Sequence, residues 1–90
     1  MDEIQKRFLD EKKLMDRVFG GLVKKSNEKE AAGFFDMAFN YYKDSSFFSE
    51  KKDFVRAYEA IVISWSYVDA GLKMGFFDVP EALLGYFTMR

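Results

Sequence analysis

The stretch from Asp53 to Gly75, DFVRAYEAIVISWSYVDAGLKMG, constrains the fold of this chain more than any other. Apolar side chains recur along it at three- and four-residue spacing, the pattern of a core-facing helix: Phe54, Ala57, Tyr58, Ile61, Trp65, Val68 and Leu72. The opposite side is interrupted by Ala60, Ile63, Tyr67, Ala70 and Met74. A helix that is apolar on most sides has several neighbours. We therefore predict a central helix over residues 54–74, with Trp65 lying between the first and second helices of the chain.

Two further helices are predicted before the central one. The first covers residues 2–23 and carries Glu11 within its apolar stripe, as a misfit or a rim residue. It should end or kink between Gly20 and Lys25, because the two glycines Gly20-Gly21 disfavour a helix by roughly 2 kcal/mol. The second covers residues 28–48, with Asn27 as its N-cap and Glu30 completing a capping box. Asp53 is expected to cap the central helix.

Three helices of similar length with short links favour an all-α, up-down-up three-helix bundle. We expect Gly75 to end the central helix. The tail, residues 75–90, should form one short helical turn packed over the end of the bundle, with these apolar side chains facing it: Phe76, Phe77, Leu83, Leu84 and Phe87. No stretch alternates with period two, so we predict no strand. Residues 1–90 are interpreted as a single helical-bundle domain.

The composition excludes several classes of chemistry. The chain has no Cys and no His, so disulfides, and catalytic triads or zinc sites that use these residues, are excluded. It contains no glycine motif for phosphate or dinucleotide binding. Its net charge of −1 provides no global field for nucleic acid. No signal-peptide pattern and no membrane-spanning apolar run occur, so we expect a cytoplasmic protein without membrane association.

Several motifs of the chain resemble an uncharacterised archaeal family. They are Tyr42 with Lys43-Asp44, the Lys52-Asp53 turn, Ala57, Asp69-Ala70-Gly71, Gly75-Phe76-Phe77 and Phe87-Thr88 of the terminal FTMR. As a set they are similar to the archaeal domain of unknown function 357 family. The resemblance covers the second and third helices and the tail, about half of the chain, while the first helix resembles the family only in pattern. Other members often have Gly where this chain has Lys52. The resemblance implies a three-helix bundle and an archaeal source, and it implies no activity.

Carboxylates are the remaining candidates for catalysis. A metal site in a helical bundle commonly uses a Glu-x-x-His spacing, which this chain cannot supply. Asp69 lies at the edge of the central apolar stripe. It would either pair with Lys73 four residues on or line a small polar pocket with Tyr42 and Tyr58. Structural ion pairs also place carboxylates in such positions. We therefore predict a protein that is not an enzyme, with no cofactor and no metal site.

Three kinds of function remain open. The leading prediction is a protein-interaction module that forms a homodimer or acts as an adaptor. Its candidate interface is Ile63, Tyr67 and Met74, which share the back of the central helix. The first alternative is an RNA- or nucleotide-associated accessory protein that uses lysine doublets. However, Lys24-Lys25 and Lys51-Lys52 fall at opposite ends of the second helix, which argues against one nucleic-acid surface. The second alternative is a binder of a small apolar ligand between the helices.

Overall fold

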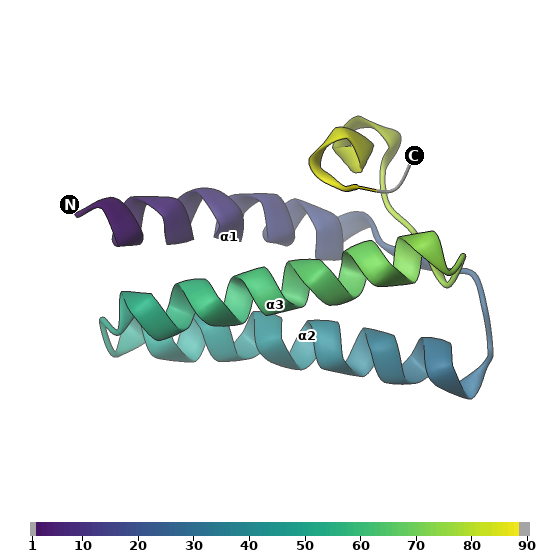
Figure 1. Cartoon of the computed structure of the whole chain (residues 1–90), viewed down its shortest axis with the longest axis horizontal. Helices are drawn as coiled ribbons and strands as arrows, with labels where there is room; N and C mark the ends of the chain where they lie inside the picture. The colour runs from purple at the N-terminus through teal and green to yellow at the C-terminus, as the bar shows by residue number, and fades with distance from the viewer. Residues whose placement is uncertain (1, 89–90) are drawn as a thin grey trace.

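Three long helices, each antiparallel to the one before it in the chain, form the fold (Figure 1). A computed structural model describes residues 2–88. Helix α1 spans Glu3–Gly21, α2 spans Lys29–Glu50 and α3 spans Phe54–Lys73. The predicted up-down-up bundle is therefore confirmed, while the last two residues of the FTMR motif lie outside the described residues. Within residues 2–88, no helix is both long enough and apolar enough to cross a membrane.

Helix α3 is the central helix, as predicted, because it packs along both α1 and α2. Its side chains Ala57, Ile61 and Val68 are fully buried. Helix α1 contributes Phe8, Met15 and Val18 to the same core, and α2 contributes Ala31 and Ala38. Burial of an Ile, Met or Phe side chain stabilises a fold by about 1.5–3 kcal/mol. The stripe that was read from the sequence is therefore the one that holds the helices together.

Two positions on α3 differ from the sequence interpretation. Trp65 was predicted to lie between the first and second helices, but it is half-buried and faces α1 and the C-terminal tail. Ala60 was assigned to the back of the central helix, but it is 5% exposed and borders a groove with Tyr41 and Phe48 of α2. Trp65 therefore packs against the tail, and Ala60 packs against α2.

The turn after α2 and the turn after α3 each contain one residue in the left-handed backbone conformation. These residues are Lys52, with φ 59°, and Gly75, with φ 77°. The turn after α2 is closed by the Asp53 amide, which donates to the carbonyl oxygen of Phe48 at 2.9 Å. Both turns have the Schellman hydrogen-bond pattern. The predicted stop at Gly75 is confirmed, and Lys52 occupies a conformation that favours glycine.

The predicted caps were right for α3 and wrong for α2. The carboxylate of Asp53 accepts a hydrogen bond from the Arg56 amide at 3.2 Å, which caps α3. Helix α2 has Glu28 at its N-cap, without a side-chain cap bond. Asn27 therefore does not cap it; instead the Ser26 hydroxyl accepts from the Glu28 amide at 3.1 Å. The chain enters α2 from an extended segment, and this moves the helix start by one residue.

The prediction that the chain has no strand was wrong. Strand β1, Val23–Lys24, pairs antiparallel with strand β2, Phe77–Asp78, with Val23 opposite Asp78. The Lys25 amide extends the pairing by donating to the carbonyl oxygen of Phe76 at 2.8 Å. Two residues are too few to show a period-two pattern in a sequence. The ladder ties the α1–α2 connection to the start of the tail.

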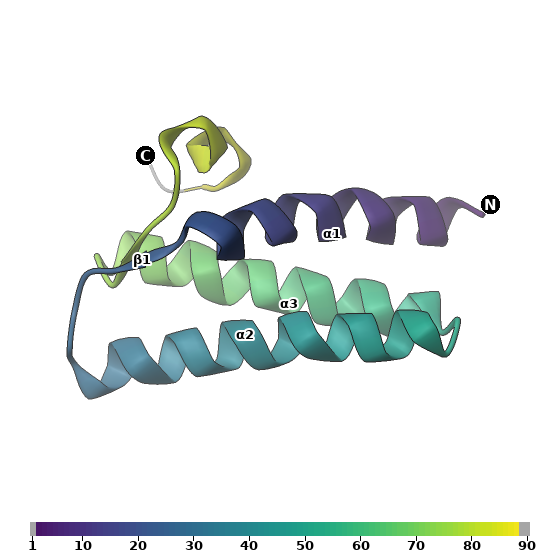
Figure 2. The same cartoon turned by 180° about the vertical axis from the view of Figure 1, so that it is seen from behind.

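The tail folds back over the end of the bundle, as predicted (Figure 2). It contains a short 3₁₀ helix, η1, at Glu81–Tyr86. Its buried side chains are Phe76, Phe77, Val79, Leu83 and Phe87. Two glycines permit this close approach, because a Cβ at Gly21 would lie 2.5 Å from Pro80 and a Cβ at Gly71 would overlap the Phe77 ring. The tail is therefore an integral part of the core.

Candidate functional site

The three residues of the predicted polar pocket are not brought together. Asp69 is 7% exposed and holds the tail, because its carboxylate accepts from the Thr88 amide at 2.9 Å and from the Thr88 hydroxyl at 2.6 Å. The ion pair with Lys73 that the sequence indicated is present, with Lys73 Nζ 3.7 Å from Asp69 Oδ2. Burial acts to raise the pKa of Asp69, but the Thr88 hydrogen bonds and the Lys73 charge outweigh it and lower this pKa.

Tyr42 belongs to a separate polar contact between α2 and α1. Its hydroxyl donates to Asp16 Oδ1 at 2.5 Å, and Lys12 Nζ lies 2.7 Å from the same oxygen. Burial, followed by the hydrogen bond and the negative charge of Asp16, raises the pKa of Tyr42 to about 12. Burial acts to raise the pKa of Asp16. The hydrogen bonds from Lys12 and Tyr42 and the charge of Lys12 outweigh burial, so this pKa is lowered. Tyr42 is thus part of an inter-helix link.

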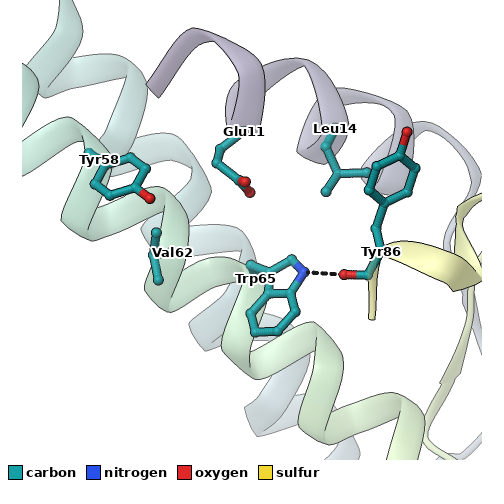
Figure 3. Close-up of a pocket in the computed structure, with 6 residues that line it drawn as sticks. All are labelled: Glu11, Leu14, Tyr58, Val62, Trp65 and Tyr86. Carbon is teal, nitrogen blue, oxygen red and sulfur yellow. Dashed lines mark hydrogen bonds between the residues drawn. The ribbon is translucent and has the colours of Figure 1, made fainter. Parts of the chain in front are cut away.

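Tyr58, the third of these residues, lines a cavity of about 270 Å³ at the junction of α1, α3 and the tail (Figure 3). The lining residues are Glu11, Leu14, Tyr58, Val62, Trp65 and Tyr86. Figure 3 shows the Glu11 carboxylate directed from α1 toward α3. Burial raises the pKa of Glu11, and the charge of Asp10 adds to this rise. The misfit of Glu11 in the apolar stripe was the only sequence signal for this cavity, and nothing in the sequence placed Tyr86 there.

The Trp65 indole forms a fixed wall of this cavity. Its Nε1–H donates to the backbone carbonyl oxygen of Tyr86 at 3.1 Å. Its ring stacks on Phe87, with the centroids 5.6 Å apart and the planes 6° apart. The next residue, Thr88, is held by Asp69. Asp69 and Trp65 together fasten the end of the tail to α3, and this closes the cavity on one side.

The predicted interface residues lie on the open side of the α2–α3 hairpin. Ile63 is 37% exposed and Met74 is 57% exposed. Tyr67 is half-buried and stacks on Tyr41 of α2, with the centroids 6.3 Å apart and the planes 11° apart. The tail leaves both Ile63 and Met74 exposed. Tyr67 is therefore packed within the hairpin, while Ile63 and Met74 present apolar surface to solvent.

An aromatic cluster with lysines over its rings lies where α1 meets α2. Its rings are Phe19, Phe35, Phe39 and Tyr42. Lys12 Nζ lies 5.1 Å from the ring centroid of Tyr42, and Lys24 Nζ lies 3.9 Å from that of Phe35. Lys43 Nζ lies 5.2 Å from the ring centroid of Phe39. These distances are typical of cation–π contacts. Lysines from α1, β1 and α2 thus converge on one surface, which the doublet pattern did not indicate.

No group of three or more acidic residues within residues 2–88 is arranged to hold a metal ion. Comparison with curated proteins finds no match for the chain. Among solved structures, the chain is similar to the crystal structure of a protein from Archaeoglobus fulgidus that carries the DUF357 family model. The two are 25% identical with a TM-score of 0.72, and the match covers 86% of this chain and 93% of that one.

A family model described as "Protein of unknown function (DUF357)" matches residues 11–77. The match includes much of α1, which the sequence motifs had linked to the family only in pattern, and it ends before η1. It contains five of the six residues that line the cavity of Figure 3, all except Tyr86. The chain therefore belongs to the DUF357 family of proteins of unknown function.

Proposed function

We propose that this protein is a non-enzymatic, cytoplasmic interaction module that forms a homodimer through the open side of its α2–α3 hairpin. We define the hairpin face as Met37, Tyr41, Phe48, Ile63, Tyr67 and Met74. The observation that carries the proposal is the exposure of Ile63, at 37%, beside the stacked rings of Tyr41 and Tyr67. Helix α1 and the tail pack against the other side of α3, so no segment within residues 2–88 covers this apolar surface.

The dimensions of the hairpin face are suitable for a second copy of the chain. Helix α2 has 22 residues, which corresponds to about 33 Å of length at 1.5 Å per residue. Two packed helices with axes about 8–10 Å apart present a width of roughly 20 Å. The area is therefore on the order of 600 Å² per partner, close to the roughly 800 Å² of standard interfaces. A two-fold contact would also place the same apolar patch against itself.

Tyr41 and Tyr67 favour association at the middle of the hairpin face. Aromatic anchors are enriched at the centres of protein interfaces, and these two rings already restrain each other by stacking. Charged side chains lie at one end of the face, where Asp44, Arg56 and Glu59 border a groove of about 160 Å³ that Ile63 also lines. The arrangement resembles an apolar interface core with a polar rim.

The test is the mass of the protein in solution, measured by sedimentation equilibrium. We expect the parent to have twice the monomer mass of 10.6 kDa at high micromolar concentration. The variants Ile63→Lys and Met37→Lys should have the monomer mass. Leu9→Lys is the matched control, because Leu9 is 38% exposed but lies on α1; this variant should remain dimeric. A monomeric parent would contradict self-association, and a dimer that survives both hairpin variants would contradict this face.

A second candidate function is binding of single-stranded RNA by the lysine–aromatic surface of α1 and α2. The specific observation is that Lys12, Lys24 and Lys43 all lie over rings of one cluster. Stacking rings beside basic side chains are typical of surfaces that bind single strands. Each phosphate contact should contribute about −0.7 to the slope of log K against log salt.

Fluorescence anisotropy of a labelled RNA 12-mer, titrated at several salt concentrations, tests this candidate. Lys24→Gln should reduce the magnitude of the salt slope by about 0.7. Lys51→Gln should leave the slope unchanged, because Lys51 lies over Phe47 at the other end of α2. Absence of salt-dependent binding at micromolar protein would exclude the RNA function.

A further inference from the structure

The cavity of Figure 3 has the chemical character of a site for an organic cation. Three of its six lining residues are aromatic, two are aliphatic and one is a carboxylate, Glu11. No Lys or Arg lines it. Aromatic faces are electron-rich and attract cations, most of all an alkylammonium group, whose methyl or methylene groups also make apolar contact. A neutral apolar ligand would leave the carboxylate without a partner.

Glu11 is the group in this cavity that lacks a partner. Within residues 2–88 its carboxylate makes no hydrogen bond and no ion pair, although it is only partly exposed. Among the other carboxylates of α1, Glu3 pairs with Arg7 and Asp16 pairs with Lys12, while Asp10 has no such partner in the described part of the chain but is exposed to solvent. Removing a charge from water without a partner is unfavourable. A bound cation would supply the missing charge at this position.

The aromatic wall is held in place before any ligand arrives. Trp65 is restrained by its hydrogen bond to the Tyr86 carbonyl oxygen and by stacking on Phe87. The tail that carries these groups is fastened to Asp69 through Thr88. A wall that is already ordered loses little conformational freedom when a ligand binds. Asp69 is therefore a positioning residue for this cavity, acting through the tail.

The size of the cavity favours a small head group over a long ligand. A neighbouring depression shares Glu11, Leu14 and Tyr86 with the cavity and is also lined by Asp10, Lys13 and Arg17, so its acidic and basic side chains balance. The cavity itself, at about 270 Å³, is smaller than the roughly 300–1,000 Å³ of sites for drug-sized ligands.

We propose that the cavity binds an alkylammonium group, with its charge against the Glu11 carboxylate and its methyl or methylene groups against the rings of Tyr58 and Trp65. The group would come either from a free amine or from a lysine side chain of a partner protein, methylated or not. None of the residues that line the cavity belongs to the hairpin face proposed for self-association, although Tyr58 and Val62 border Ile63 in a neighbouring depression.

Trp65 makes the experiment direct, because it is the only tryptophan in the chain and lines the cavity. Its fluorescence is titrated with choline, with n-butylammonium, and with 3,3-dimethyl-1-butanol, the neutral isostere of choline. We expect a saturable change with the ammonium ligands at millimolar concentration or below, and binding of the isostere at least about tenfold weaker. Peptides that contain lysine or trimethyl-lysine, compared with the free amines, distinguish a partner side chain from a small metabolite.

Two variants separate the role of Glu11 from a general loss of structure. Glu11→Gln should weaken choline binding about tenfold without unfolding the protein, because it removes an unpaired, partly buried charge. Glu3→Gln makes the same change on the same helix, about 12 Å away along its axis, and should bind choline like the parent. In the parent, the pKa of Glu11 followed by carbon-13 NMR should fall when choline saturates the site, since a nearby cation favours the carboxylate.

The outcomes that would overturn the proposal are distinct. If choline and its isostere bind equally and Glu11→Gln has no effect, the cavity is an apolar-ligand site. If neither the Trp65 fluorescence nor the pKa of Glu11 responds to choline at tens of millimolar, a concentration at which even a very weak site fills, the cavity does not bind this class of ligand.

Discussion

Gly71 offers a sharp test of the packing between α3 and the tail. A Cβ at this position would overlap the ring of Phe77, which is 2% exposed. The ring cannot move aside easily, because it also meets Phe35 of α2 at a centroid distance of 6.3 Å. Gly71→Ala should therefore force Phe77 or the tail to shift. Gly33 on α2 is the matched position, since nothing lies within 4 Å of a Cβ placed there.

The two substitutions should change stability in opposite directions. Overpacking a core costs about 1–3 kcal/mol, while replacing a helical Gly by Ala stabilises by up to about 1 kcal/mol. Because a Cβ at Gly71 would overlap the Phe77 ring, the overpacking cost should lie at the upper end of this range, and we expect Gly71→Ala to lower the free energy of unfolding by about 2 kcal/mol. Gly33→Ala has only the favourable contribution and should raise the free energy of unfolding by about 1 kcal/mol.

Urea unfolding followed by circular dichroism measures both changes, and thermal melts provide a check. One kcal/mol corresponds to a shift of about 4–8 °C in Tm for a domain of this size. In Gly71→Ala, the further change Phe77→Leu should cost less than it does alone, because the smaller side chain leaves room for the methyl group. If Gly71→Ala is as stable as the parent, the tail does not pack on α3 as described.

Four further predictions follow from single features of the fold. Lys52→Gly should raise the free energy of unfolding by about 1 kcal/mol in urea titrations, because it relieves a left-handed backbone at φ 59°; a loss of stability would contradict this turn. Asp69→Ala should lower the free energy of unfolding by about 1–3 kcal/mol and shift the fluorescence of Trp65 to longer wavelength, because Thr88 loses its acceptor and the tail loosens. An unchanged emission maximum would contradict the role of Asp69 in holding the tail. The folded pKa of Tyr42, about 12 against an ordinary 10.0, implies a contribution to stability that is fully present below pH 10 and lost as pH rises through 12. Tyr42→Phe should lack this contribution when the free energy of unfolding is measured against pH. If the parent and the variant show the same pH dependence, this prediction is wrong. Purified protein with Mg²⁺, Mn²⁺ or Zn²⁺ should not hydrolyse phosphoesters or nucleic acids, and metal-dependent turnover would overturn the non-enzyme proposal.

The local elements of this protein could be predicted from the sequence because their signals lie within a few residues. The apolar spacing between Phe54 and Leu72 indicated the central helix, and Asp53 and Gly75 were recognised as its cap and its stop. Residues three or four positions apart share one face of a helix whatever surrounds them. The short links predicted between the helices then favoured antiparallel neighbours.

The candidate cavity and the contacts of Asp69 depended on tertiary structure. Glu11 and Trp65 come from different helices, and Tyr86 lies 21 residues beyond Trp65. Thr88, the partner of Asp69, is 19 residues away from it. Such neighbours leave no periodic signal, because they meet only after the tail has folded back across Gly71. The sequence by itself therefore determined three helices and their order, while only the packing of the tail decided which side chains surround the cavity and which apolar face remains open.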